Sequence, residues 1–123
     1  AVNSHNTSLE REVRSSLHRK GLRFARNSAS LPGSPDIVLP RWGAVVFVHG
    51  CFWHRHRNCR LAQNPKSNRA YWEKKFASNV DRDRRVEAEL RRMGWRVFVI
   101  WGCEATNGRM LDRLSARITT GVR

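Results

Sequence analysis

The segment from residue 50 to residue 68 constrains the fold of this chain most, because it lacks the apolar spacing that packs a helix or strand onto a core. It is rich in histidine, cysteine and arginine instead, and Cys51, His56 and Cys59 follow one another closely in it. Such a segment needs something other than a hydrophobic face to hold it in place. We therefore expect a metal ion to organise this loop.

The remaining cysteine, Cys103, follows the last expected strand, from which the chain could return to the loop. Three thiolates and one imidazole form a closed tetrahedral zinc site, which is structural because catalytic zinc keeps one position open for water. Other interpretations stay open: the cysteines are buried free thiols, or His56 contacts nucleic acid, or His54 is the histidine ligand. The predicted zinc ligands are Cys51, His56, Cys59 and Cys103.

Apolar residues outside this loop recur at the spacings of amphipathic helices and short strands. The fully apolar run 44–48 is typical of a strand in the middle of a sheet. The order helix, three strands, metal loop, helix, strand, helix predicts an α/β fold of α+β character, with a small mixed sheet flanked by helices in a single domain over residues 1–123. The expected helices are residues 7–20, 69–92 (bent near 78–79) and 109–118, and the expected strands are 22–26, 37–39, 44–48 and 95–101.

The charge balance points to a polyanionic partner. The chain carries 24 lysines and arginines against 10 aspartates and glutamates, a net charge of +14, which excludes an acidic surface and favours nucleic acid. No apolar run approaches the length of a membrane span, and the first residues lack the features of a secretory signal. Because the number of cysteines is odd and no export signal is present, we expect a cytoplasmic protein, and we expect it to be a monomer.

A second group of chemically active residues precedes the metal loop. Asp36 ends the proline-containing loop 27–35 and enters a short strand, where its carboxylate is a suitable ligand for Mg²⁺. His49 ends the next strand and lies beside Asp36 if the two strands pair as a hairpin. Taken alone, Pro35-Asp36 is more typical of a plain turn, and it is His49 that favours a site.

These residues resemble a nuclease signature in which Pro-Asp is followed by an acid-x-Lys triplet on the next strand. Here the triplet reads Phe47-Val48-His49, so the second acid is absent and histidine replaces lysine. Longer motifs are similar to one branch, the very short patch repair (Vsr) endonuclease family, over residues 7–118, and imply a restriction-endonuclease-like fold. The motifs are Ser30-Leu31-Pro32-Gly33-x-Pro35-Asp36, Phe47-Val48-His49-Gly50-Cys51-Phe52-Trp53-His54, Asn79-Val80-x-Arg82-Asp83-x-Arg85, Gly94-Trp95-Arg96-Val97 and Trp101-x-Cys103.

The resemblance also implies catalytic roles. Asp36 would ligate Mg²⁺ together with the main-chain carbonyl of Val48. His54 would be the general base that activates the attacking water, and His49 would assist at the scissile phosphate or the leaving oxygen. A neutral imidazole can accept a proton at physiological pH, so the reaction does not require a second carboxylate.

The N-terminal part of the chain adds two expectations to the same resemblance. Glu10 matches an acidic position that holds the active site in place, and the alternative is that Glu10 forms a capping box with Thr7. Family members carry a longer basic arm that clasps DNA before the first helix. Only Ala1 to Asn6 stand there in this chain, so we expect the arm to be short or trimmed.

Large aromatic residues in the metal loop indicate how DNA is read. Phe52 and Trp53 lie between an expected zinc ligand and the expected base, where a wedge between base pairs explains them better than a solvated loop does. Unstacking costs least at a mismatch, so insertion discriminates defective DNA. Trp72 matches a third such aromatic, although a core position on its helix is at least an equal alternative. The loop arginines expected to contact phosphates are Arg55, Arg57 and Arg60.

The sequence therefore predicts an endodeoxyribonuclease. By resemblance it nicks one strand of double-stranded DNA 5′ of the thymine in a T:G mismatch left by deamination of 5-methylcytosine. The expected cofactors are catalytic Mg²⁺ and structural Zn²⁺, and the expected setting is a bacterial nucleoid with other repair proteins. One alternative is a restriction or defence nuclease that cuts paired sites, and another is a zinc-stabilised nucleic-acid-binding protein without catalysis.

Overall fold

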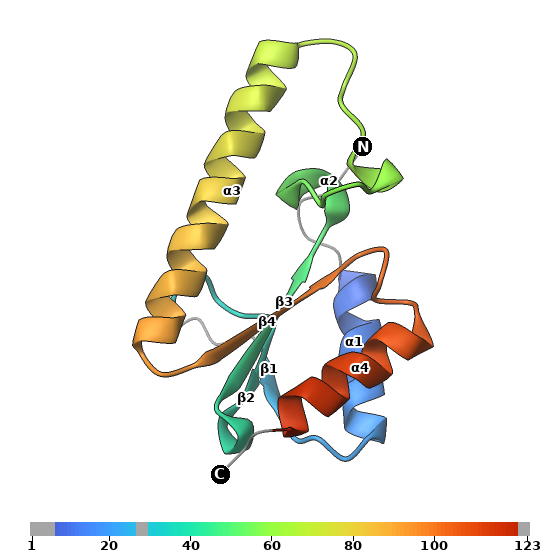
Figure 1. Cartoon of the computed structure of the whole chain (residues 1–123), viewed down its shortest axis with the longest axis vertical. Helices are drawn as coiled ribbons and strands as arrows, with labels where there is room; N and C mark the ends of the chain where they lie inside the picture. The colour runs from blue at the N-terminus through green and yellow to red at the C-terminus, as the bar shows by residue number, and fades with distance from the viewer. Residues whose placement is uncertain (1–6, 27–29, 121–123) are drawn as a thin grey trace.

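The computed structural model describes residues 7–26 and 30–120 of the chain, which contain both helices and strands (Figure 1). The elements are α1 (Thr7–Arg19), β1 (Ala25–Arg26), β2 (Ile37–Leu39), the 3₁₀ turn η1 (Pro40–Trp42), β3 (Ala44–His49), α2 (Cys51–His54), the 3₁₀ turn η2 (Arg60–Ala62), α3 (Arg69–Arg92), β4 (Arg96–Trp101) and α4 (Gly108–Thr119). The mixed α/β class predicted from the sequence is confirmed.

The strands form one sheet in the order β1-β2-β3-β4. β2 pairs antiparallel with β1 and β3, whereas β4 lies parallel to β3, with Ala44 opposite Arg96 and His49 opposite Trp101. A parallel pair needs a long crossover, and α3 supplies most of it. β3 therefore occupies an interior position in the sheet, as its fully apolar sequence predicts.

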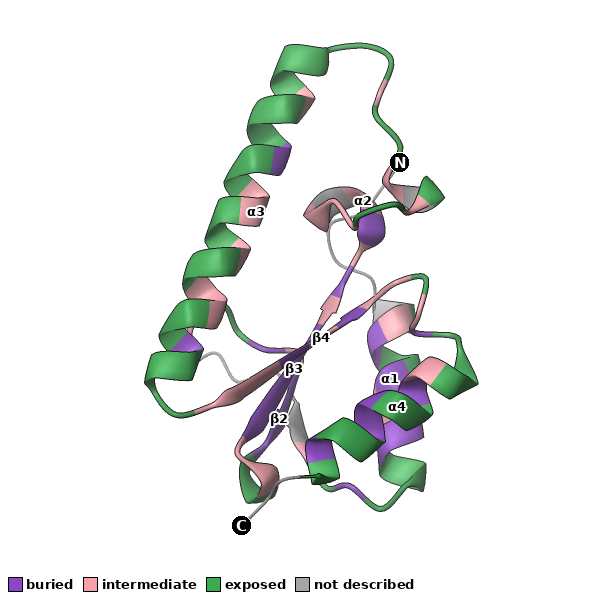
Figure 2. Cartoon of the chain, in the orientation of Figure 1, coloured by how far each residue is buried: buried purple, intermediate pink, exposed green. Residues whose placement is uncertain are grey.

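Helices cover both faces of the sheet (Figure 1). On one face, Val13 of α1 and Leu114 of α4 belong to the same buried cluster as Val46 of β3. On the other face, Leu90 near the end of α3 packs with Phe47 of β3. The N-terminal half of α3 extends past the sheet, is mostly exposed, and has α2 beside it (Figures 1 and 2). The ends of β3 and β4 thus face a space bounded by α2 and α3.

Two details differ from the expectations. The predicted strand 22–26 exists only as Ala25–Arg26, because the backbone N–H of Leu22 donates to the carbonyl of Leu17 at 3.1 Å and so still belongs to the end of α1. The loop 50–68 also contains α2 and η2, which are too short to show an apolar period. None of the helices in the described ranges is both long and apolar enough to cross a membrane.

The side chain of Arg96 joins three separate elements. Its Nη1 donates to the carbonyl of Ile118 at 2.8 Å and to that of Trp42 at 3.3 Å, and its Nη2 donates to the carbonyls of Arg117 at 2.8 Å and Thr120 at 3.0 Å. The last carbonyls of a helix have no partner within the helix, and a cation near them is stabilising. One guanidinium thereby ties β4 and η1 to the C-terminal end of α4.

Replacing this guanidinium should lower stability measurably. We expect Arg96→Ala to reduce the free energy of unfolding by about 2 kcal/mol, because two partly buried and two exposed carbonyls lose a charged donor. Urea denaturation measures the loss, and Arg109→Ala, at an exposed position in the first turn of α4, is the matched control. Equal stability of Arg96→Ala and the control would contradict this account of the α4 terminus.

Candidate active site and metal centre

The exit of β3 brings two histidines together. Gly50 follows the strand in an extended conformation, α2 makes a single turn in which the N–H of His54 donates to the carbonyl of Gly50 at 3.1 Å, and Arg55 stops the turn at a φ of 55°. This turn lays the ring of His54 on that of His49, with centroids 4.0 Å apart and an interplanar angle of 4°. The two imidazoles expected in the site are therefore in direct contact.

An aspartate from the middle of α3 completes this group. The Oδ2 of Asp83 lies 2.5 Å from the Nδ1 of His54, and both side chains are mostly shielded, with 17% and 13% of their surface exposed. The carboxylate fixes the orientation of the ring and occupies Nδ1. Nε2 of His54 is then the nitrogen that can exchange a proton with a substrate or a water.

His49 is the buried member of this group. Burial, and then the neighbouring His54 ring, lower the pKa of His49 to about 4. The ring is therefore neutral at physiological pH, which permits close stacking on His54 without charge repulsion.

These groups line a cavity of about 410 Å³ at the ends of β3 and β4. His49, His54 and Asp83 lie in it with Arg55, Arg57 and Arg84. Cations around a cleft attract anionic ligands and concentrate them there. The cleft therefore combines a proton-exchanging imidazole with the charge that a phosphate group requires.

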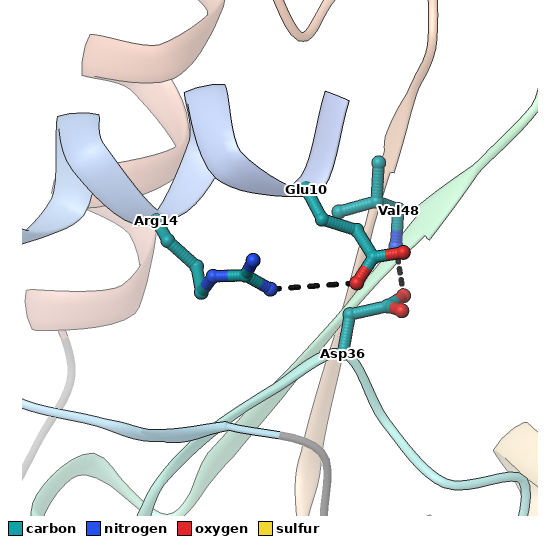
Figure 3. A network of polar contacts seen from close by, with 4 residues as sticks. All are labelled: Glu10, Arg14, Asp36 and Val48. Atoms are coloured by element: carbon teal, nitrogen blue, oxygen red, sulfur yellow. Dashed lines mark hydrogen bonds and ion pairs between the residues drawn. The ribbon is translucent and has the colours of Figure 1, made fainter. Parts of the chain in front are cut away.

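Asp36 lies against the backbone of β3 (Figure 3). Its Oδ2 accepts a hydrogen bond from the N–H of Val48 at 2.7 Å. The N–H and C=O of one residue in an extended strand face the same side, so the Val48 carbonyl faces the side of Asp36. The carbonyl of His49 faces β4 instead, where it accepts from the N–H of Gly102 at 2.8 Å. One carboxylate and one main-chain carbonyl, both hard oxygen donors, thus lie on the same side of β3.

Glu10 of α1 reaches the same place from the other side. Its side chain is buried, accepts a hydrogen bond from Nη1 of Arg14 at 3.4 Å, and points toward Asp36 (Figure 3). Two carboxylates that share a buried site favour a nearby cation. This position fits an acidic residue that supports the site.

The predicted zinc ligands converge from two distant segments. Sγ of Cys51, Nδ1 of His56, Sγ of Cys59 and Sγ of Cys103 all lie within 4.8 Å of one another. Nδ1 of His56 is 3.6 Å from Sγ of Cys51 and 3.4 Å from Sγ of Cys103. Ligand bonds of about 2.3 Å to sulfur and about 2.0 Å to nitrogen give tetrahedral edges of about 3.5 Å between them. The cluster therefore has the dimensions of a metal centre.

Contact lengths separate this cluster from the histidine group. Nδ1 of His54 and Oδ2 of Asp83 are only 2.5 Å apart and form a hydrogen bond, and the ligand atoms of His49, His54 and Asp83 also lie close enough to one another to hold a metal ion. Desolvation and the neighbouring thiols raise the pKa of Cys103 to about 12, and burial raises the pKa of Cys51, so a bound cation would have to displace protons from these thiols.

The expected DNA-contacting residues are placed differently from one another. Phe52 packs edge-on against Trp72 and Phe76 of α3, with centroids 5.6 and 5.1 Å away. The guanidinium of Arg55 lies 4.1 Å from the Phe76 ring centre and donates to Oδ1 of Asn64 at 2.7 Å. Trp72 is half-buried, so it is not a fully buried core residue. Arg57 and Arg60 are exposed, and the side chain of Trp53 lies outside the described part of the structure.

Sequence reasoning missed Asp83 as a site residue. It stands in the motif Asn79-Val80-x-Arg82-Asp83-x-Arg85, but its charge reads as one of several acids that offset the basic residues of α3. Only the fold shows that it is the acid that meets His54. The signal available in the sequence was its place in that motif.

An imidazole oriented by a carboxylate in a cationic cleft is typical of the active site of a hydrolase that acts on phosphodiesters. Comparison with known proteins narrows this class. A family model described as DNA mismatch endonuclease Vsr matches residues 1–61. The chain belongs to the Vsr family, and it is an endodeoxyribonuclease.

Several relatives are similar over most of the chain. The type II nicking enzyme V.XorIIP of Xanthomonas oryzae pv. oryzae is 50% identical over 117 residues, which cover 95% of this chain and 83% of the relative. The DNA mismatch endonuclease Vsr of Escherichia coli is 42% identical over 109 residues, covering 89% and 69%. The type II nicking enzyme V.NmeAIP of Neisseria meningitidis is 42% identical over 125 residues, covering 98% and 89%.

Cobalt binding can test whether a metal ion binds through the thiolates of the Cys/His cluster and not at the histidine group. We expect Co²⁺ added to metal-free protein to bind one ion per chain with an intense thiolate-to-cobalt absorption band, because thiolates are its ligands in the Cys/His cluster. Cys59→Ser should weaken binding and reduce the band. Asp83→Asn is the control and should leave the spectrum unchanged. A spectrum without the thiolate band would contradict the assignment.

Proposed function

We propose that this protein nicks one strand of duplex DNA in a Mg²⁺-dependent reaction, 5′ of the thymine in a T:G mismatch left by deamination of 5-methylcytosine. The nick would begin very short patch repair. The contact between His54 and Asp83, next to His49 in the cationic cleft, carries the catalytic part of the proposal. The mismatch part is supported by the name of the E. coli relative, a DNA mismatch endonuclease.

The general base in this proposal is His54. Nε2 would take a proton from the attacking water, and Asp83 would hold the ring in one tautomer and stabilise the imidazolium that forms. His49, neutral and stacked beside it, would assist at the scissile phosphate or the leaving oxygen. The cations of the cleft would bind the phosphate near these rings.

Asp36 and the main-chain carbonyl of Val48 would hold the Mg²⁺ ion, with Glu10 supporting Asp36. The fit is chemical: Mg²⁺ prefers oxygen ligands and is held in nucleotide-processing sites by one or two carboxylates while it keeps several waters. When bound, the ion supplies positive charge that stabilises the developing negative charge on the phosphate. Because the carbonyl and not the side chain is the ligand, valine at position 48 is compatible with this role.

The Cys/His cluster would hold Zn²⁺ as a purely structural ion. All four positions of a tetrahedral ion would be taken by Cys51, His56, Cys59 and Cys103, so none is left for water. Such an ion would fasten α2 and its following loop to the end of β4. This fastening keeps His54, at the end of α2, in its place.

The scaffold in this proposal is restriction-endonuclease-like, in a single monomeric domain. A mixed sheet with an aspartate entering β2 and a histidine ending the adjacent β3 supports it. The proposed wedge consists of Phe52, Trp53 and Trp72, which would unstack the mismatched step. Arg57 and Arg60 are exposed and suited to phosphate contacts, whereas Arg55 braces the aromatic residues between α2 and α3.

Single substitutions test the catalytic roles. We expect Asp36→Ala and His54→Ala to abolish Mg²⁺-dependent nicking while the protein stays folded, and Asp83→Asn to lower kcat by at least about 100-fold because His54 loses its orienting charge. Single-turnover nicking of a labelled T:G duplex measures this. Glu89→Gln, at an exposed position on α3, is the control. Wild-type rates in Asp36→Ala or His54→Ala would refute the assignment.

The choice of substrate has a separate test. We expect a T:G duplex to be nicked much faster than the paired duplex, and Trp72→Ala to reduce this preference because the wedge is incomplete. Arg57→Ala should lower the slope of log binding constant against log salt by about 0.9, the effect of one phosphate contact. Equal cleavage of paired DNA would favour a restriction or defence nuclease. No Mg²⁺-dependent nicking of any duplex would favour a binding protein without catalysis.

A further inference from the structure

Trp101, the last residue of β4, lies between the metal cluster and the histidine group. Its ring stacks on that of His56, with centroids 4.4 Å apart and an angle of 11°, and meets the ring of His49 edge-on at 5.2 Å and 72°. Trp101 is also the parallel-strand partner of His49. A continuous series of ring contacts therefore runs from His56 through Trp101 and His49 to His54.

The environment of Trp101 differs from that of Trp42 and Trp95. In the described part of the chain, Trp42 and Trp95 pack against the two buried apolar clusters, whereas Trp101 belongs to neither and lines the cleft. Its backbone N–H donates to Oε1 of Glu104 at 3.0 Å, and Cys103 follows two residues later. The indole is thus fixed at its backbone and packed on two imidazoles rather than on the core.

We propose that Trp101 is a positioning residue that transmits the order of the Cys/His metal centre to His49. The inference rests on the proposed catalytic role of the histidines. His49 has the His54 ring on one face, Phe47 at 5.8 Å and the Trp101 edge at 5.2 Å. Without the indole, the His49 ring loses its contact with β4. The ring is then free to tilt on that side, away from its parallel stack with His54.

The same indole also contacts a residue of the Cys/His cluster. His56 offers Nδ1 to the cluster, and its ring stacks on Trp101. Because the two rings are nearly parallel and in contact, the His56 ring limits how far the indole can tilt. Metal binding at His56 therefore restrains Trp101, and Trp101 restrains His49.

Three variants test this role. We expect Trp101→Leu to lower kcat for nicking by about 10- to 100-fold, the scale of a small misplacement of a catalytic group, with KM for the duplex changed less than about twofold. Trp101→Phe should recover most of the rate, because a phenyl ring can still pack on both imidazoles. Trp95→Leu, which removes an indole just before the same strand, is the matched control and should keep the wild-type rate.

Two further measurements separate positioning from structure. The Co²⁺ absorption spectrum of Trp101→Leu should equal that of the wild type, and loss of the thiolate band would overturn the proposal by making Trp101 a scaffold of the metal centre. In protein with ¹⁵N-labelled histidine, the ring signals of His49 should move in Trp101→Leu and not in Trp95→Leu. Unchanged His49 signals together with an unchanged kcat would also overturn it.

The ring signals do not depend on nicking, so the two proposals can fail separately. If the wild type nicks no duplex, the proposed function fails while the His49 signals still test the coupling. If the wild type nicks and Trp101→Leu is equally fast with unmoved His49 signals, the coupling alone fails.

Discussion

The site depends on how one helical turn is held. α2 has only four residues, and a helix of that length has no stability of its own. Its first residue, Cys51, belongs to the Cys/His cluster, and its second, Phe52, packs on the aromatic rings of α3. Its last residue, His54, is stacked and hydrogen-bonded from two other elements. Each contact comes from outside the turn, so the position of the proposed base is a property of the whole fold.

The Cys/His cluster and the histidine group differ in the spacing of their side chains. Nitrogen and sulfur atoms 3.4 to 3.6 Å apart leave room for an ion at the centre of the Cys/His cluster. The 2.5 Å contact of His54 with Asp83 is shorter and forms a hydrogen bond. Burial and then the neighbouring His54 ring lower the pKa of His49 and keep it neutral, and the Arg82 cation acts in the same direction because a positive charge disfavours the imidazolium.

The sequence predicted the structure best at residue types that occur in only a few kinds of environment in folded proteins. The apolar run of β3 lies inside the sheet, the carboxylate of Asp36 lies against the backbone of β3, and the three cysteines lie close to His56. The sequence did not predict site residues whose place depends on a contact between segments far apart in the chain. Asp83 lies 29 residues from His54, on a helix with acids on several sides, so no local pattern distinguishes it. The braced position of Arg55 likewise arises from a meeting of α2 with α3.

The continuity of α3 has a mechanical consequence. Trp72 and Asp83 belong to one uninterrupted helix of 24 residues, about 16 Å apart along its axis at about 1.5 Å per residue. Because the helix is continuous, a movement of the segment that carries Trp72 also moves the segment that carries Asp83. If Trp72 senses distorted DNA as proposed, the helix that carries it also carries the carboxylate that contacts His54. Mismatch recognition and strand cleavage would then depend on the same helix, α3.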